Sequence, residues 1–462
     1  MAKDLRTYIK SLEEQFPEEV IRVKKAVDGG AYEASALLEA LDRQGRYPAV
    51  LFENLADLNL QDTAFRLMMN AHSSVKSMAF SLGAEKPDRL GAMNAFNNGA
   101  ARPLPVQEIS PEEAPLMDLV WQGGAVDLTK LPIPRMNDMD GGPYLTPAIA
   151  ARDPENGRYN LSWNRAMFID KNHMGLWMSP RHLWGIFSRA EAAGKNLPIA
   201  IVAGHHPAFF LSGAALTKLD KDEYETAGGI LGESLRVIPS VSYGKELMIP
   251  ADAEIVIEGE IVADRRTIEG PFGEFTQYTG PQRLSWLVEV KAVCARKDGI
   301  ILNIFGGHQE NLYAHLPIQA DIFASLKAIV PSVKDVSWIE SGGPMNLIIQ
   351  LDKKVEGEPL RAAMAAMSLS NFIKHVTVVD KDIDIGNLKQ VMWAVSTRVQ
   401  ADRDVNIVKN IQGQVLDPSI NEEISGSGMI IDATKPVGAP FAVKAQPPEE
   451  MVRKINIADY TG

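Results

Sequence analysis

The sequence predicts an α+β and α/β multidomain protein, in which an antiparallel β-barrel or curved sheet precedes a separate α/β domain. Two patterns lead to this prediction. From about residue 120 to residue 300, short strand patterns separated by glycine and proline recur at regular spacing, as in antiparallel barrels. Further along, strand and helix patterns alternate, which is typical of an α/β domain. The length of 462 residues is enough for two or three domains.

The N-terminal elements follow from capping and periodicity. Asp4 is placed to cap a helix over residues 4–16, on which three apolar residues share one face: Leu5, Ile9 and Leu12. A second helix is expected at residues 32–44, and a strand is expected after it at 48–55.

Residues 97–122 are expected to form a linker and then a helix. Ser110 and Glu113 match a capping box, and Pro111 stands in the first turn of that helix. The strands expected in the barrel follow at residues 131–136, 157–169, 197–204, 233–240, 253–262 and 284–305.

The C-terminal part begins with a helix expected at residues 317–331. Strand, helix, strand and helix then alternate at 345–351, 361–372, 373–380 and 388–399. The last residues are proline-rich and then amphipathic, so we expect a tail at a subunit interface. The patterns divide the chain into an N-terminal α/β region (1–110), a barrel domain (111–312), a linking helix (313–332), a C-terminal α/β domain (333–440) and the tail (441–462).

Composition excludes several classes of protein. The formal net charge is -12, whereas proteins that bind nucleic acid or an anionic membrane need a basic face. The single cysteine, Cys294, rules out an intrachain disulfide, and its strand context favours a small buried side chain. The sequence has no signal-peptide pattern and no run of about 18 apolar residues, so we expect a cytoplasmic protein without a membrane partner.

One short motif brings two like charges close together. Glu269 and Glu274 stand five positions apart in IEGPFGEFTQYTG, so on an unbroken strand their side chains would point to opposite faces. The Gly-Pro-Phe-Gly segment between them breaks that alternation and can turn both acids toward one place. The same turn also has a purely structural interpretation, in which it only shapes the barrel.

Several stretches together resemble the UbiD family of reversible decarboxylases, which use prenylated FMN. EGPFGE after AEIVIEG resembles the family signature, NLSWNR its Asn-x-x-x-x-Arg segment, and EYETAGGILG its Glu-x-x-x-x-Gly-x-x-x-Gly segment. LKQVMWAVSTR and IIDAT resemble two stretches of its C-terminal domain. The likeness covers most of residues 110–435 and implies that the barrel is split and binds flavin. The first hundred residues match only in general character.

The resemblance implies a metal and cofactor site. Asn160, His182 and Glu223 take the positions of ligands to a divalent metal, usually manganese, that bridges to the cofactor phosphate. An amide oxygen, an imidazole and a carboxylate suit Mn²⁺ or Mg²⁺. Potassium is implied beside the same glutamate, on main-chain carbonyls within residues 212–216. Further residues implied to bind the cofactor are Ser162, Arg165, Arg181 and Lys389, with Lys389 reaching the phosphate.

The catalytic residues implied by the resemblance are Arg165, Glu269 and Glu274. Arg165 would hold the substrate carboxylate with its planar guanidinium, and Glu269 would pair with Arg165 and orient it. The cofactor would take up the electrons as CO2 leaves, and Glu274 would donate the proton that replaces CO2. The implied reaction is therefore the reversible, non-oxidative decarboxylation of an aromatic, heteroaromatic or α,β-unsaturated carboxylic acid.

The substrate pocket is expected to be polar, which favours a hydroxylated or heteroaromatic acid. Its expected lining residues are Phe272, His308, Gln309, Gln414 and Leu416. Arg296 could hold a second carboxylate of a diacid substrate, but a surface position is expected for it. Surface or structural roles are expected for His205 and His206, which are neighbours in the sequence. The resemblance also implies a UbiX-type flavin prenyltransferase as cofactor supplier and assembly into a homodimer or higher homo-oligomer.

Two alternatives remain open at this point. An ordinary flavin oxidoreductase on a split barrel would have no need for two paired glutamates with an arginine, nor for a metal that bridges to phosphate. A non-catalytic subunit of a larger carboxylase complex would be indicated by loss of an acid or of the arginine, whereas all three residues are present.

Overall fold

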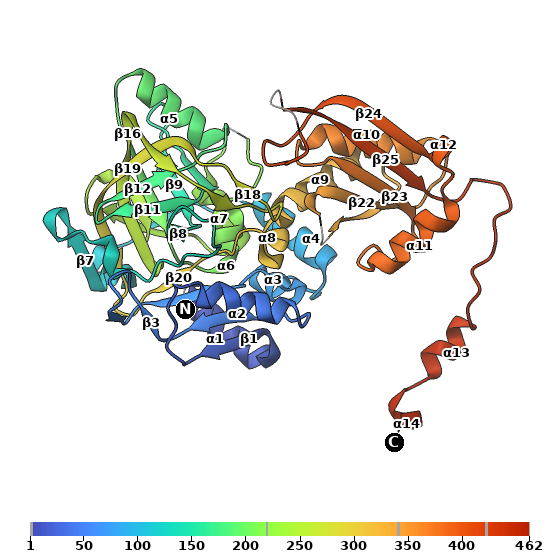
Figure 1. Ribbon diagram of the computed structural model, residues 1–462, viewed down its shortest axis with the longest axis horizontal. Helices are drawn as coiled ribbons and strands as arrows, with labels where there is room; N and C mark the ends of the chain where they lie inside the picture. The colour runs from blue at the N-terminus through green and yellow to red at the C-terminus, as the bar shows by residue number, and fades with distance from the viewer. Residues whose placement is uncertain (1–2, 219, 340–341, 421–423, 462) are drawn as a thin grey trace.

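The computed structural model describes residues 3–218, 220–339, 342–420 and 424–461. Within these ranges three large sheets follow one another along the chain, each with its own helices (Figure 1). A four-stranded sheet lies near the N-terminus, a nine-stranded sheet curls on itself, and a five-stranded sheet belongs to the C-terminal part. The predicted class, mixed α/β and multidomain, is confirmed.

The N-terminal sheet has the strand order β1-β2-β5-β20. The elements of this region are α1 (Leu5–Gln15), β1 (Val20–Val23), α2 (Glu33–Asp42), β2 (Ala49–Phe52), β3 (Leu55–Ala56), β4 (Asp62–Thr63), β5 (Arg66–Met69), α3 (Val75–Ser81) and α4 (Arg89–Ala100). Asp4 caps α1 as predicted, accepting a hydrogen bond from the Thr7 amide at 2.8 Å. The fourth strand, β20 (Ile300–Leu302), arrives from the far end of the central region and pairs in parallel with β5.

The central sheet is antiparallel along the order β10-β9-β13-β16-β19-β12-β11-β8, with β7 added beside β19. Its strands are β7 (Leu119–Gln122), β8 (Tyr144–Leu145), β9 (Ala148–Arg152), β10 (Tyr159–Trp163), β11 (Ala166–Asp170), β12 (His173–Leu176), β13 (Leu197–Val202), β16 (Ile255–Glu269) and β19 (Arg283–Ala295). Register shifts between β16 and β19 help to bend this long pair, as bulges do. The predicted split antiparallel barrel is this curled sheet.

Short helices and a small sheet cover the curled sheet. They are β6 (Gln107–Glu108), α5 (His182–Ala192), α6 (Pro207–Ser212), α7 (Glu223–Leu231), β14 (Arg236–Ser240) and β15 (Gly244–Pro250). Cys294 is fully buried in β19, as its strand context predicted.

Two predictions of local structure are wrong, and proline explains most of the difference. Residues 131–136 form no strand, because two of them are prolines that cannot donate to a ladder. The helix expected after residue 110 is two short 3-10 segments, Pro111–Glu113 and Pro115–Asp118, since Pro115 interrupts the backbone hydrogen bonds. The Ser110–Glu113 capping box is present all the same.

The C-terminal sheet has the order β21-β22-β23-β25-β24. Its elements are α9 (Leu316–Ile329), β21 (Val333–Ile339), β22 (Gly343–Leu351), α10 (Glu358–Leu369), β23 (His375–Asp380), α11 (Leu388–Arg398), α12 (Ala401–Asp404), β24 (Val405–Gln412) and β25 (Ser425–Ala433). Helices α9 and α10 pack on one face, and α11 packs on the other around Val391 and Ala394. Helix α8 (Gln309–Ala314) leads into α9 between the curled central sheet and the C-terminal sheet (Figure 1).

The last residues extend away from the rest of the chain (Figure 1). They carry α13 (Glu449–Lys454) and α14 (Ala458–Thr461), on which several apolar side chains are exposed. Placement of this tail at a subunit interface stays a prediction. In the part of the chain that the structure describes, none of the helices has the length and apolar character needed to cross a bilayer.

Candidate active site

The two glutamates of the IEGPFGE motif converge because the chain turns sharply between them. Glu269 ends β16, and Gly270 adopts a φ of +85°, a conformation that glycine tolerates. Beyond this turn β17 (Phe272–Gly273) pairs with β18 (Thr279–Gly280), and the Gly273 amide donates to Asp140 at 2.9 Å. Both acids therefore reach the same arginine on the opposite wall of the curled sheet.

Arg165 stands between the two acids and binds them unequally. Its Nε and Nη2 atoms donate to the two oxygens of Glu269 at 2.7 and 2.9 Å, and its Nη1 atom donates to Glu274 Oε1. Tyr144 adds a third hydrogen bond to Glu269 at 3.0 Å, and burial raises the pKa of Tyr144, so this phenol remains a donor. Glu269 is therefore fixed on two sides, whereas Glu274 is held on one.

The side chains of Arg165 and Glu274 lie at a cavity. Arg165, Glu269 and Glu274 are 7%, 0% and 9% exposed, so the single cation and both acids are largely withdrawn from water. Arg165 and Glu274 line a cavity of about 210 Å³ between the curled sheet and the C-terminal sheet. Its aromatic lining residues are Trp163, Trp177, Phe210, Phe272, Phe275 and Phe372. Such a cavity suits a flat, largely apolar ligand that carries one acid group.

The structure brings three of the five expected pocket residues to this cavity. Phe272, Gln414 and Leu416 line it, the last two from the segment after β24. His308 and Gln309 do not line it, although polar residues such as Asn311 and His315 do, so a polar pocket stays a prediction. The loop of His308 and Gln309 reverses at Gly306 and Gly307, so these two residues line a neighbouring cavity.

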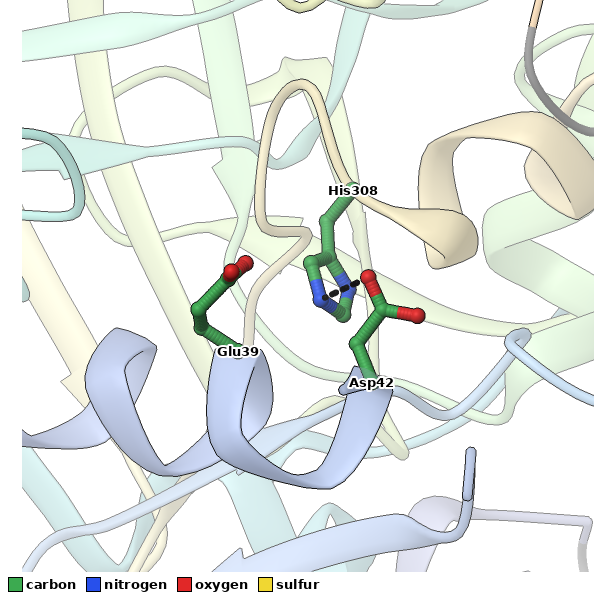
Figure 2. Close-up of side chains that lie close together, drawn as sticks. All are labelled: Glu39, Asp42 and His308. Carbon is green, nitrogen blue, oxygen red and sulfur yellow. Dashed lines mark ion pairs between the residues drawn. The ribbon is translucent and has the colours of Figure 1, made fainter. Parts of the chain in front are cut away.

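In that neighbouring region His308 faces Glu39 and Asp42 of α2 (Figure 2). The sequence analysis did not predict most of the aromatic residues that line the cavity at Arg165. Trp163 stands inside the NLSWNR segment itself, and its indole beside Arg165 was the signal that could have revealed them.

Asn160, His182 and Glu223 also come together, from three different elements. Asn160 lies on β10, His182 begins α5, and Glu223 begins α7 behind its cap, Asp222. Asn160 Nδ2 donates to Glu223 Oε2 at 2.8 Å, and His182 Nδ1 lies 3.2 Å from Glu223 Oε1. The strand and the two helix starts thus bring an amide, an imidazole and a carboxylate to one point.

This cluster retains an unused acceptor. Asn160 Oδ1 is buried and has no hydrogen-bond partner among the described residues. A buried oxygen without a donor is costly, and a metal ion is one partner that satisfies it. With a carboxylate and an imidazole beside it, the donor set fits Mn²⁺ or Mg²⁺.

A cavity of about 340 Å³ opens beside this cluster, and cations stand at it. Arg181 and Lys221 line it together with Asn160, His182 and Glu223. Cations next to a metal cluster suit a bound phosphate. The cavity therefore has the local positive charge that an anionic group would need, although the net charge of the chain is -12.

The other residues expected to bind the cofactor are spread around the curled sheet. Ser162 follows Asn160 on β10 and accepts a hydrogen bond from Asn164 Nδ2 at 2.9 Å. The Arg181 guanidinium lies 5.6 Å from the ring centre of Phe372 and so reaches the C-terminal part. Residues 212–216 run on from the last residue of α6, and the hydroxyl of the next residue, Thr217, donates to Glu223, so this segment lies beside that glutamate.

Lys389 is not brought to these residues. Strand β23 begins shortly after Phe372, which lines the aromatic cavity at Arg165, and it extends from there to Asp380. Lys389 follows at the far end, exposed in the first turn of α11 and on the sheet face away from α9 and α10. The lysine at the near end is Lys374, whose Nζ lies 2.7 Å from Asp417.

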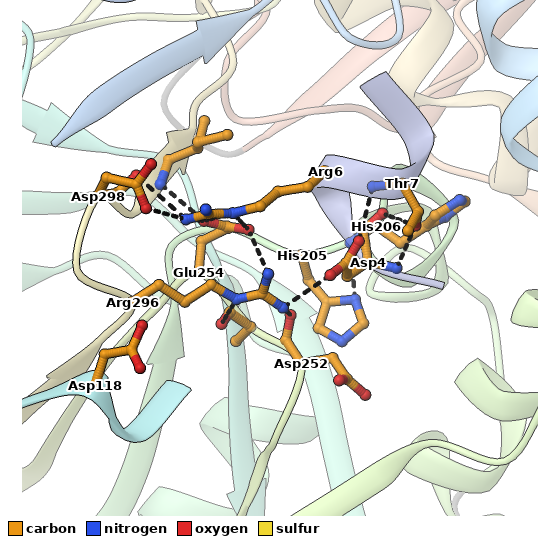
Figure 3. Close-up of polar contacts among 12 residues, drawn as sticks. Asp4, Arg6, Thr7, Asp118, His205, His206, Asp252, Glu254, Arg296 and Asp298 are labelled. Carbon is orange, nitrogen blue, oxygen red and sulfur yellow. Dashed lines mark hydrogen bonds and ion pairs between the residues drawn. The ribbon is translucent and has the colours of Figure 1, made fainter. Parts of the chain in front are cut away.

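Arg296, His205 and His206 are all buried. The predicted surface position for Arg296 is therefore wrong. Arg296 pairs with Asp4 at 2.9 Å and with Glu254 at 3.3 Å, and it also donates to main-chain carbonyls (Figure 3). His206 caps α6 by accepting a hydrogen bond from the Ala208 amide. These residues join α1 to the central sheet, a structural role.

Comparison with known proteins adds independent findings. Three family models match the chain, described as the N-terminal, Rift-related and C-terminal domains of 3-octaprenyl-4-hydroxybenzoate carboxy-lyase, UbiD. They cover residues 11–94, 107–309 and 312–433. The phenolic acid decarboxylase of Sedimentibacter hydroxybenzoicus is 30% identical over 99% of this chain and 95% of its own length.

Solved structures match over nearly the whole chain. The UbiD-class enzyme HmfF from Pelotomaculum thermopropionicum, in complex with FMN, aligns with a TM-score of 0.91 and 35% identity, over 99% of this chain and 100% of that one. An evolved dimeric form of HmfF in complex with prFMN aligns with a TM-score of 0.88 and 33% identity, over 99% and 100% of the two chains.

Proposed function

The chain belongs to the UbiD family of carboxy-lyases, and we propose that it is a prenylated-FMN-dependent decarboxylase of an aromatic, heteroaromatic or α,β-unsaturated carboxylic acid. Relatives with FMN and prFMN bound support this cofactor. The observation that carries the proposal is the buried set Arg165, Glu269 and Glu274, which opens on an aromatic cavity.

The substrate carboxylate is held by Arg165. A guanidinium binds a carboxylate through two parallel N–H bonds, which fixes its plane as well as its position. Glu269 keeps the guanidinium in place through two hydrogen bonds, and Tyr144 keeps Glu269 in place. A substrate carboxylate that takes up the Nη1 side of Arg165 would release Glu274 from its single contact.

Glu274, once released, is the proton donor. When bound, prenylated FMN supplies the electron sink that accepts the electron pair as the bond to CO2 breaks. Glu274 then gives its proton to the carbon that lost CO2, forming the new C–H bond, and regains a proton from solvent. In the carboxylation direction the same carboxylate removes that proton. The aromatic walls exclude water from the carbon while this exchange takes place.

Asn160, His182 and Glu223 would hold a divalent metal ion, which would supply positive charge for the cofactor phosphate. Asn160 Oδ1 supplies the free acceptor, and Mn²⁺ fits this mixed set of ligands. Arg181 and Lys221 add positive charge beside it, and Ser162 lies next to Asn160 on the same strand. Main-chain carbonyls within residues 212–216, beside Glu223, would hold potassium.

We extend the proposal to the cellular setting. A UbiX-type prenyltransferase supplies the modified flavin, the protein works in the cytoplasm, and it assembles as a homodimer or larger homo-oligomer. The exposed apolar side chains of the tail support assembly. The two alternative functions lose ground, because an ordinary flavin oxidoreductase does not need the buried acid pair, and a non-catalytic subunit would not retain the complete set.

One experiment tests the function directly. The full chain is produced with and without a co-expressed flavin prenyltransferase, and both preparations are supplied with a panel of benzoic, heteroaromatic and cinnamic acids. We expect CO2 release only from the prenylated preparation, with a flavin spectrum that differs from that of FMN. Equal release from both preparations would overturn the assignment of the cofactor, and oxidation of a substrate without CO2 release would favour the oxidoreductase.

A further inference from the structure

A second group of side chains that could bind a metal lies away from the cavity at Arg165, where α2 meets the loop after β20. Glu39 and Asp42 stand three positions apart on α2 and so share a face. His308 points toward both acids from the loop (Figure 2). One ligand atom from each of the three residues lies within 4.8 Å of the other two.

His308 lacks the partners that a buried imidazole needs. It is 7% exposed, and neither ring nitrogen has a hydrogen-bond partner in the described part of the chain. The Asp42 carboxylate comes closest, with Oδ2 at 3.5 Å from Nε2, which is longer than a normal hydrogen bond. Phe305 stacks on the ring with 4.9 Å between centres and keeps it turned toward α2. An unpaired nitrogen aimed at two carboxylates is an arrangement that a cation completes.

We propose that Glu39, Asp42 and His308 form a binding site for a divalent transition metal of the Zn²⁺ class. One imidazole and two carboxylates are ligands that Zn²⁺ accepts, leaving a position for water. Zinc bonds of about 2.0–2.2 Å place tetrahedral ligands roughly 3.4 Å apart, so spacings of up to 4.8 Å must shorten by up to about 1.4 Å. The Glu39 and Asp42 side chains are 46% and 37% exposed and have the freedom to make that movement.

The surroundings of His308 also favour metal binding. Arg43 pairs with Glu39 at 2.9 Å, but that pair is on the surface and easily replaced. A cavity lined by Asp42 and His308 gives water and ions a way in.

The same metal would brace the loop that lies behind the proton donor. A Cβ built on Gly306 would stand 2.3 Å from the Gly273 carbonyl oxygen, and one on Gly307 would stand 2.9 Å from that of Glu274. The loop backbone therefore lies directly against the turn that carries Glu274. A metal that ties His308 to α2 would act on Glu274 through this contact, as a positioning effect.

Metal binding by stripped, cofactor-free full-length protein tests this site. Zinc is titrated into the protein with a competing chelator, and Co²⁺ is added separately because its visible absorption reports low coordination number. We expect one zinc site whose affinity is unchanged in two control variants. His182→Ala removes a residue of the other proposed metal site, and Glu14→Gln removes an exposed acid on α1 outside the group of Glu39, Asp42 and His308. In Asp42→Asn and His308→Gln, affinity should fall by more than about 100-fold, beyond the cost of losing an outer partner.

Each outcome decides the matter. Loss of the site in Asp42→Asn supports it even if His308→Gln folds poorly, because Asp42 is half-buried on a helix surface. Wild-type affinity in both variants would overturn the proposal, as would a chain whose metal binding disappears in His182→Ala. The measurement uses neither flavin nor turnover, so its failure would leave the proposed function untouched.

Discussion

Two buried arginines of this protein are each placed between two acids, and they differ in what remains unsatisfied. Arg296 binds Asp4 and Glu254, and further hydrogen bonds go to main-chain carbonyls. Glu254 receives a second cation, Arg6, at 3.0 Å. Every charge there has several partners, and this network does not line the substrate cavity.

The Arg165 network has the same composition but is less completely paired. Glu269 has three hydrogen bonds, Glu274 has one to the same guanidinium, and Arg165 and Glu274 open on an aromatic cavity. The comparison teaches that a buried arginine with two acids is not by itself a catalytic site. The informative feature is an ionisable group with few partners at a cavity.

The largest effect should come from Glu274→Gln. The change keeps the shape and one hydrogen bond to Arg165 but removes the transferable proton, so turnover should fall by on the order of 10²–10⁴-fold. Thermal stability should stay near wild type, because the Glu274 side chain makes one hydrogen bond within the described part of the chain. Initial rates of CO2 release and a melting curve check both halves. A large loss of stability would show that Glu274, like the acids around Arg296, mainly stabilises the fold.

The opposite pattern is expected for Arg296→Met. Removing the cation takes one of two cationic partners from the fully buried Glu254 and the ion-pair partner from the partly buried Asp4, and breaking such a pair costs roughly 3–5 kcal/mol. Chemical denaturation measures that loss of unfolding free energy. The fraction that remains folded should show wild-type turnover per active site, and a fall in turnover of 10-fold or more would indicate that the Arg296 network also supports the reaction.

His182→Ala tests the metal cluster and should have a smaller effect on the fold. Wild-type protein with flavin bound should contain about one Mn²⁺-like ion per chain. The variant should lose the metal and retain at least about 10-fold less flavin after gel filtration. Elemental analysis and flavin absorbance provide the readouts. Full flavin content without metal would contradict the role given to Asn160, His182 and Glu223.

The smallest effect is expected for Lys389→Ala. Because Lys389 is exposed at the far end of β23, flavin retention should not change. Lys374→Ala is the matched variant at the near end, where the ion pair with Asp417 holds the segment that carries Gln414 and Leu416. It should raise the KM for substrate. If only Lys389→Ala reduced flavin content, the placement of this helix relative to the cofactor would be wrong.

Local patterns in the sequence predicted much of this molecule. Asp4 and the alternating strands of the curled sheet follow rules that act over a few residues. The turn between Glu269 and Glu274 was also predictable, because Gly270 permits the positive φ that a sharp reversal needs and Pro271 favours a turn.

The errors arise where distant segments decide. Lys389 was misplaced because sequence order does not tell which end of β23 faces the cleft. His308 was misplaced because the glycine pair before it turns its side chain toward α2. Arg296 was expected at the surface because its partner Asp4 lies almost 300 residues earlier in the chain. These three positions depend on tertiary contacts that no local pattern records.

The role of Glu274 as proton donor is the central claim, and hydrogen exchange tests it most directly. The decarboxylated product is incubated in D2O with holoenzyme, and deuterium at the carbon that would receive CO2 is followed by NMR. Wild-type protein should exchange this hydrogen, and Glu274→Gln should abolish the exchange although product still binds. Glu269→Gln, which retains the acid, should exchange at a measurable rate. Exchange by Glu274→Gln at the wild-type rate would show that the proton comes from another group.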